Sequence, residues 1–128
     1  MLKSNKLSVL LVDDKEEFIS ALSQRLVLYG MEVCTATRGE DALAILQEKT
    51  VDVVVLDVVM PGMSGLEILR RIKDIFPHIQ VVLLTGHGTT KDGIEGMRQG
   101  AFDYLMKPVD IEELIEKMKA AAKAIVKE

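Results

Sequence analysis

The stretch VDVVVLD, residues 51–57, decides the fold, because a nearly continuous apolar run ends there on an aspartate. Two similar runs, SVLLV at Ser8–Val12 and QVVLL at Gln80–Leu84, are also rich in Val and Leu. Continuous rather than alternating apolar residues are typical of strands covered on both faces, as in a parallel sheet. We therefore predict strands at Ser8–Val12, Met31–Thr35, Val51–Leu56, Gln80–Leu84 and Tyr104–Met106, the second being an alternating edge strand.

Segments with apolar residues at helical spacing separate these strands. They predict helices over about Lys15–Tyr29, Gly39–Lys49, Gly65–Phe76 and Thr89–Gln99, and a fifth that starts after Asp110. Gly30, Pro77 and Gly100 are stop signals, and Asp110 is an expected N-cap with Glu113 at the capping-box position. The residues expected to face the core are Phe18, Leu22, Leu26, Tyr29, Ala42, Leu43, Leu46, Leu69, Ile72, Phe76, Ile111, Leu114, Ile115, Met118, Ala122 and Ile125. Strict alternation with short connections predicts a parallel sheet with helices on both faces.

Length and composition narrow the class of protein. The 128 residues suit one domain, spanning 1–128, with an ordinary globular balance of 48% hydrophobic and 28% charged residues. A formal net charge of −4 argues against a general nucleic-acid backbone binder. No apolar run approaches the length of a membrane span, residues 1–7 lack a signal-peptide pattern, and Cys34 is the only cysteine. We expect a soluble cytoplasmic protein without contact to membranes.

Polar residues of a few types follow the predicted strands. Asp13 and Asp14 follow the first strand, Asp57 the third, Thr85 the fourth and Lys107 the fifth. Singly, these residues suit helix caps or turns. Together they meet at the carboxyl edge of the sheet, where open α/β sheets bind their ligands. The joint pattern therefore predicts a functional site at this edge.

The residue types predict the chemistry of that site. If the first and third strands are neighbours, three carboxylates lie close together and repel one another. A hard divalent ion such as Mg²⁺ offsets this charge and prefers oxygen ligands. Lys107 adds a positive charge and Thr85 a hydroxyl donor. Such a pocket suits a phosphoryl group, whose charge grows on its equatorial oxygens.

Four segments carry a resemblance that covers essentially the whole chain. They are Asp13-Asp14, Asp57–Gly65, Thr85-Gly86 and Phe102–Pro108. With them the sequence resembles the receiver domain of two-component response regulators. The resemblance implies a flavodoxin-like (βα)5 three-layer sandwich with five parallel strands in the order 2-1-3-4-5.

The resemblance also implies a role for each carboxylate. Asp57 would be the phospho-acceptor and would form an acyl phosphate. Asp14 and Asp57 would ligate Mg²⁺ directly together with the backbone carbonyl of Val59, and Asp13 would act largely through water.

Further roles follow from the same resemblance. Thr85 would move inward to bond a phosphoryl oxygen, Lys107 would pair with the phosphate, and the Lys107–Pro108 peptide bond would be cis. Tyr104 would be the aromatic switch, swinging between outward and inward rotamers.

The resemblance implies partners as well. The donor would be a phosphohistidine on a sensor kinase or phosphotransfer protein, and the domain would be a self-phosphorylating, self-dephosphorylating switch rather than a turnover enzyme. We expect any homodimer to form through the fourth helix, the last strand and the last helix. The domain itself is not expected to bind nucleic acid, whether it is complete or the first part of a longer regulator. Its sequence around Leu84–Gly88 and Gly100–Tyr104 looks like receivers that precede an ATPase and a DNA-binding output.

Two features concern rate and flexibility. Val59 and His87 occupy positions that tune phosphoryl lifetime in this family, and we hypothesise that Val59 obstructs the attacking water. The fourth helix contains Gly93 and Gly96, each costing roughly 1 kcal/mol relative to Ala in a helix interior. We therefore expect this helix to be soft, and we predict that it and the loop before it shift on phosphorylation.

Three other functions compete with this interpretation. A flavodoxin-type FMN carrier shares the topology, but Asp13-Asp14 would repel an unassisted phosphate and the chain has no Trp. An aspartate-nucleophile phosphohydrolase usually has an Asp-x-Asp pair after its first strand and a cap domain. In this sequence the two aspartates are adjacent and the chain is short. A receiver-like adaptor would bind partners without phosphorylation, and the complete residue set argues against it.

Overall fold

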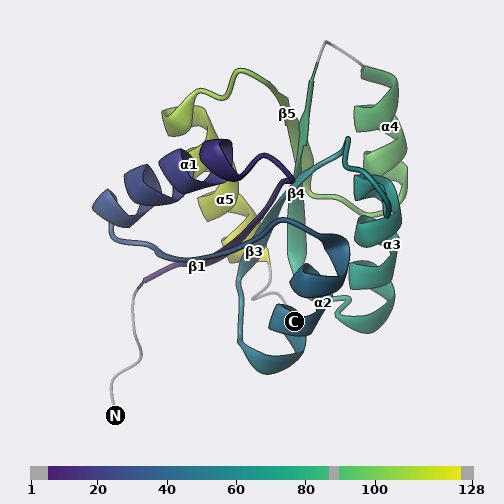
Figure 1. The fold of residues 1–128 in the computed structure, drawn as a ribbon, viewed down its shortest axis with the longest axis horizontal. Coiled ribbons are helices and arrows are strands. Elements are labelled where there is room, and N and C mark those ends of the chain that lie inside the picture. Colours follow the sequence, from purple (N-terminus) through teal and green to yellow (C-terminus); the bar gives the residue numbers. More distant parts are fainter. Residues whose placement is uncertain (1–5, 87–89, 125–128) are drawn as a thin grey trace.

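The structure, a computed structural model, describes residues 6–86 and 90–124. Strands and helices alternate along these residues (Figure 1). The strands are β1 (Ser8–Val12), β2 (Glu32–Ala36), β3 (Val53–Asp57), β4 (Gln80–Thr85) and β5 (Asp103–Met106). The helices are α1 (Glu16–Leu28), α2 (Gly39–Glu48), α3 (Gly65–Ile75), α4 (Thr90–Arg98) and α5 (Ile111–Ala124). The predicted order of elements is confirmed, with the ends of the predicted elements shifted slightly.

The sheet has the predicted topology. Its strands are all parallel and lie in the order β2-β1-β3-β4-β5. Helices α1 and α5 cover one face, and α2, α3 and α4 cover the other (Figure 1). The fold is therefore the expected flavodoxin-like three-layer sandwich, with β2 at one edge. The direction of winding reverses between β1 and β3, and a ligand crevice is expected at the carboxyl ends of these strands.

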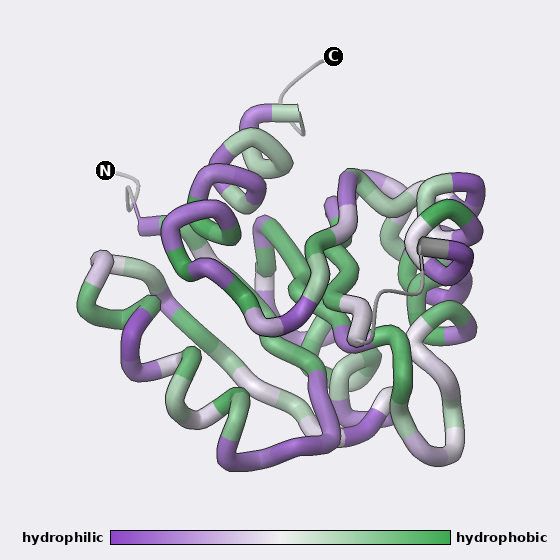
Figure 2. Tube along the Cα trace, turned by 90° about the horizontal axis from the view of Figure 1, so that it is seen from above, coloured by the Kyte–Doolittle hydropathy of each residue, from purple (hydrophilic) through white to green (hydrophobic). Residues whose placement is uncertain are grey.

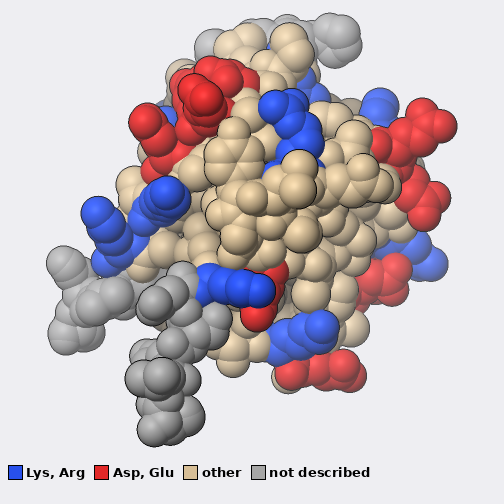
Figure 3. Space-filling model, turned by 90° about the vertical axis from the view of Figure 1, so that its left-hand side faces the viewer, with Lys and Arg blue, Asp and Glu red and all other residues tan. Residues whose placement is uncertain are grey.

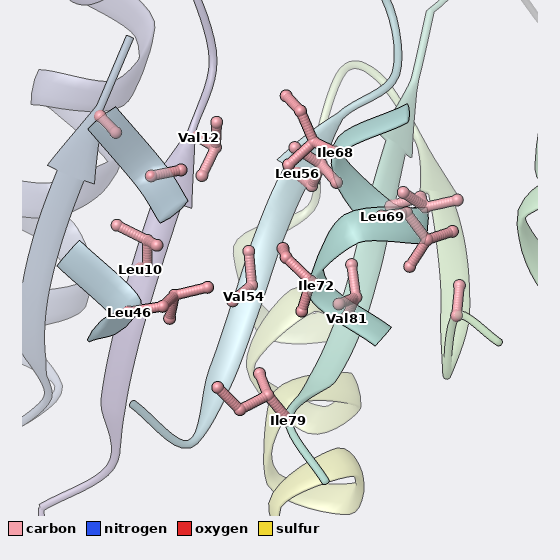
Figure 4. Packing of buried hydrophobic residues seen from close by; sticks show 14 of the residues in the cluster. Leu10, Val12, Leu46, Val54, Leu56, Ile68, Leu69, Ile72, Ile79 and Val81 are labelled. Carbon is pink, nitrogen blue, oxygen red and sulfur yellow. The ribbon is translucent and has the colours of Figure 1, made fainter. Parts of the chain in front are cut away.

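Alternate side chains of each strand enter two separate cores. Leu10 and Val12 of β1 pack with α2 and α3 (Figure 4), whereas Val9 and Leu11 of the same strand pack with α1 and α5. Because successive residues of a strand point to opposite faces, a strand buried on both faces must be apolar at every position. This explains the continuous Val and Leu runs in the sequence.

The distribution of hydropathy follows the layers. The strands at the centre are largely hydrophobic, while the surrounding helices alternate between hydrophobic and hydrophilic residues (Figure 2). Among the described residues, no helix combines the length and the apolar character that crossing a membrane requires.

Most residues predicted to face the core are buried or packed against it, but Tyr29 is not. Helix α1 ends at Leu28, and Tyr29 is its C-cap residue with 52% of its surface exposed. The helical spacing that predicted an inward Tyr29 no longer applies once the helix has ended. In α5, Ala121 is the fully buried alanine and Ala122 is only partly buried. The predictions for Thr89 and Ile125 lie outside the described residues.

The start of α5 agrees with the expected cap. The Asp110 carboxylate accepts a hydrogen bond of 3.3 Å from the N–H of Glu112. The Asp110 carbonyl accepts one of 2.9 Å from the N–H of Leu114. Asp110 is therefore an N-cap residue, and it fixes α5 directly after the strand that delivers Lys107.

Candidate functional site

Three carboxylates meet at the carboxyl edge of the sheet. Val12 of β1 pairs with Leu56 of β3, so the residues that follow them lie side by side. One oxygen each of Asp13, Asp14 and Asp57 lies within 4.8 Å of the others. Asp13 and Asp57 are buried, and Asp14 is half-buried. The predicted acidic group thus exists, and these oxygens could hold a metal ion.

The Lys107 ammonium points into this acidic group. Its Nζ lies 2.8 Å from Asp13 Oδ2 and 3.6 Å from Asp57 Oδ1. The backbone N–H of Lys107 donates to the Thr85 carbonyl at 2.8 Å, and the peptide bond to Pro108 is cis, as predicted. The backbone therefore ties Lys107 to the end of β4 while its side chain spans to the end of β1.

The electrostatics of Asp57 reflect this crowding. Burial raises the pKa of the Asp57 carboxyl above its ordinary value, and the neighbouring charge of Asp13 raises it further. Lys107 and a backbone hydrogen bond from Val59 lower this pKa in part. One lysine therefore does not fully offset the carboxylates, and the site favours a further cation.

Two polar atoms of the site have no partner among the described residues. Asp14 Oδ1 and Thr85 Oγ1 are both buried without a hydrogen bond. Buried polar groups in folded proteins nearly always have a partner. The two atoms come from the carboxyl ends of different strands, β1 and β4. They fit a site that receives a cation at the carboxylate and an acceptor oxygen at the hydroxyl.

The loop after β3 is held against Asp57 by a glycine. A Cβ at Gly65 would come within 2.2 Å of the Asp57 carbonyl oxygen, so a side chain there would displace the start of α3. The Gly65 N–H donates to the Val58 carbonyl at 2.9 Å. This turn leaves Val59 beside the carboxylate with 66% of its surface exposed.

Thr85 and Tyr104 both lie close to their predicted positions, Thr85 at the end of β4 and Tyr104 within β5. Thr85 is the last residue of β4 rather than the residue after it, and it is buried. Tyr104 is half-buried in β5 and packs against the α2–α3 core. Its ring lies against Gly93 of α4. His87 lies outside the described residues.

One neighbour of the site was missed by sequence reasoning. The ring of Phe18 lies under Lys107, with 4.4 Å between Nζ and the ring centroid. The sequence predicted Phe18 as a core residue only, because an aromatic at an apolar helix position carries no further signal. Its packing against the α1–α5 core confirms that part of the prediction.

Comparisons with known proteins identify the family. The family model described as response regulator receiver domain matches residues 9–119. The chain is 41% identical over 108 residues to the response regulator protein FleR of Pseudomonas aeruginosa, covering 84% of this chain and 23% of FleR. It is 38% identical over 113 residues to the DNA-binding transcriptional regulator NtrC of Salmonella typhimurium, covering 88% of this chain and 24% of NtrC.

A solved structure shows the same fold. A response regulator receiver domain protein from Clostridium thermocellum superposes with a TM-score of 0.88 and 38% identity, covering 92% of this chain and 95% of that one. The chain thus matches an isolated receiver domain over almost its whole length, but spans only about a quarter of FleR and NtrC. The chain belongs to the response regulator receiver domain family of two-component signalling.

Proposed function

We propose that this domain accepts a phosphoryl group on Asp57 from a phosphohistidine of a sensor kinase or phosphotransfer protein. The observation that carries the proposal is the meeting of Asp13, Asp14 and Asp57 within 4.8 Å, beside the Lys107 ammonium. A nucleophilic carboxylate among cation ligands, with an amine next to it, suits the transfer of an anionic group.

Mg²⁺ is the proposed cofactor, and the residues present fit it. Asp14 and Asp57 would hold it with the Val59 carbonyl, and Asp13 would contribute largely through water. The buried, unpartnered Asp14 Oδ1 and the raised pKa of Asp57 both favour an added cation. When bound, such an ion neutralises charge on the phosphoryl oxygens and on the carboxylates.

The residues of the chain then act around one transfer step. A carboxylate oxygen of Asp57 forms the new bond to phosphorus while the bond from phosphorus to the donor imidazole nitrogen breaks and the imidazole leaves. Lys107 pairs with one phosphoryl oxygen, and the Thr85 hydroxyl, which has no hydrogen-bond partner among the described residues, donates to another. Hydrolysis of the acyl phosphate by water releases inorganic phosphate and returns Asp57 to its free carboxylate.

We propose that phosphorylation of Asp57 moves Thr85, that Tyr104 responds, and that the surface formed by α4, β5 and α5 changes as a result. This surface exposes the apolar side chains of Ile94, Met97 and Met106. A change there would control an output domain, a partner or a second copy of the chain. FleR and NtrC are named as regulators and are about four times longer than the matched region, which supports control of an output elsewhere in the protein.

Direct nucleic-acid binding by this domain is not part of the proposal. The formal net charge is −4. The face seen in Figure 3 is largely uncharged at its centre, and the acidic and basic side chains around it are interspersed. A phosphate backbone is bound by clustered Lys and Arg.

Intact mass after incubation with acetyl phosphate tests the proposal. We expect a Mg²⁺-dependent gain of one phosphoryl group in wild type and none in Asp57→Asn. Phosphorylation that persists in Asp57→Asn would refute Asp57 as the acceptor. No mass gain with any small-molecule or phosphohistidine donor would favour the adaptor instead.

A further inference from the structure

The Lys107 ammonium has a third neighbour that is not a carboxylate. Besides the contacts to Asp13 and Asp57, its Nζ lies 4.4 Å from the centroid of the Phe18 ring. A cation within about 6 Å of an aromatic ring centroid, over its face, is attracted by the ring quadrupole, and more strongly when both are shielded from water. The Lys107 side chain is only 22% exposed. The ring therefore attracts the amine as well as filling space beside it.

We propose that Phe18 is a positioning residue for Lys107 in phosphoryl acceptance, an inference that rests on the proposed function of Asp57. Both carboxylates that contact the amine also belong to the acidic group that could hold a metal ion. Any cation engaged by Asp13 therefore weakens the closest of the amine's contacts. The Phe18 ring has no charge or lone pair to offer a metal, so its attraction for Lys107 does not compete with the metal.

The placement of Phe18 in the fold supports this role. The residue lies in the first turn of α1, directly after the loop that carries Asp13 and Asp14. It is half-buried and packs against the α1–α5 core, which fixes the ring position. Lys107 follows β5, which is an edge strand of the sheet. The contact thus joins the start of α1, next to Asp13 and Asp14, to the residue that follows β5 and reaches Asp57.

The test compares three variants of the chain. Phe18→Leu removes the aromatic face but keeps an apolar side chain, and Phe18→Tyr keeps the face. Phe102→Leu is the matched control, because Phe102 is also half-buried against the same core. Each is assayed for its rate of phosphorylation by acetyl phosphate with saturating Mg²⁺. The NMR shift of the Lys107 Hε protons, which a ring face moves upfield, reports the contact itself.

We expect Phe18→Leu to slow phosphorylation by roughly 3- to 10-fold and to abolish the upfield shift of Lys107. Phe18→Tyr should retain both, and Phe102→Leu should match wild type. Equal slowing by Phe18→Leu and Phe18→Tyr, or by Phe18→Leu and Phe102→Leu, would overturn the proposal in favour of a packing role. A wild-type rate in Phe18→Leu would overturn it outright.

Failure of the proposed function and failure of the Phe18 contact can be told apart. If wild type itself gains no phosphoryl group, the proposed function fails. The NMR shift of the Lys107 Hε protons then shows by itself whether the Phe18 ring contacts the amine. If Phe18→Leu does not fold, Phe18→Met takes its place, since Met adapts to irregular core space without an aromatic face.

Discussion

The ring of Tyr104 in β5 lies so close to Gly93 in α4 that a Cβ on Gly93 would be 2.5 Å from Tyr104 Cε2. Gly96, one turn further on, approaches Leu83 of β4 in the same way, with 2.1 Å between its added Cβ and Leu83 Cδ1. Both glycines are buried, whereas Ile94 and Met97 are exposed by 53% and 42%. Helix α4 therefore rests on the sheet through its glycines.

A Cβ at position 93 tests this packing. Gly→Ala in a helix interior ordinarily stabilises by about 1 kcal/mol, but here the methyl group meets the ring. We expect Gly93→Ala to lower the free energy of unfolding by about 1–3 kcal/mol, the usual cost of overpacking. In a Tyr104→Ala background the same change should be neutral or stabilising. Urea unfolding of the four proteins of this double-mutant cycle measures the coupling.

Gly96→Ala is the control for that cycle. Its cost should be the same with or without Tyr104, because its clash is with Leu83. A Gly93→Ala variant more stable than wild type would show that the Tyr104 ring moves away freely.

Helix α4 is predicted to respond to the state of Asp57. Its only buried described positions are glycines, and such a helix has few apolar contacts to hold it. With Mg²⁺ and a phosphoryl analogue, amide exchange in α4 should change by about fivefold or more, the low end of typical coupling between sites. Helix α2, whose Ala42 and Leu46 are buried, should not change. Unchanged amide exchange in α4 would contradict the prediction. The loop before α4, which is predicted to shift with it, includes residues 87–89, and these lie outside the described residues.

The exposed side chain of Val59 is predicted to lengthen the life of the acyl phosphate. An amide at this position could hydrogen-bond a water and orient it toward phosphorus, which valine cannot do. Val59→Asn should therefore shorten the half-life of the acyl phosphate severalfold. Val59→Ile, which stays apolar, should not. Decay of the phosphorylated mass with time gives the half-lives, and equal values for wild type and Val59→Asn would end the hypothesis.

Ionised Asp57 is predicted to destabilise the metal-free protein. Burial and the Asp13 charge raise its pKa in the folded state above the ordinary value of 3.8. Between the ordinary and the raised pKa, the folded state binds more protons than the unfolded state, so stability falls as pH rises. At neutral pH, Asp57→Asn should therefore raise the melting temperature by a few degrees in the absence of Mg²⁺.

The pH dependence gives the control for that prediction. The gain from Asp57→Asn should shrink as pH falls through the raised pKa, because the wild-type carboxyl then becomes neutral. Melting curves at neutral and acidic pH with a chelator present measure it. A variant that is less stable than wild type at neutral pH would mean that the ion pair with Lys107 outweighs burial and Asp13.

Much of the site was predictable because of one geometric rule. Parallel strands end at the same edge of a sheet, so Asp13, Asp14, Asp57, Thr85 and Lys107 had to gather once their strands were recognised. Recognition was straightforward because strands covered on both faces are apolar throughout. The element ends differ slightly from the predicted ones, and Tyr29 is exposed because α1 ends before it.

Contacts between distant elements were not predictable in this way. Phe18 and Gly93 looked like a core aromatic and a helix-weakening glycine, since neither has a local partner that would show otherwise. Their neighbours, Lys107 and Tyr104, come from other elements and reach them only through packing.

The sequence by itself determined the α/β fold class, the succession of strands and helices, and which residues follow each strand, because apolar periodicity is a local property. The strand order 2-1-3-4-5 was expected from the resemblance to receiver domains, and the structure confirms it. Only the tertiary structure decided that Lys107 lies closer to Asp13 than to Asp57, that Phe18 lies under it, and that α4 packs through glycine. Each of these contacts joins residues of different elements that lie a few ångströms apart, so it depends on how closely the helices pack against the sheet.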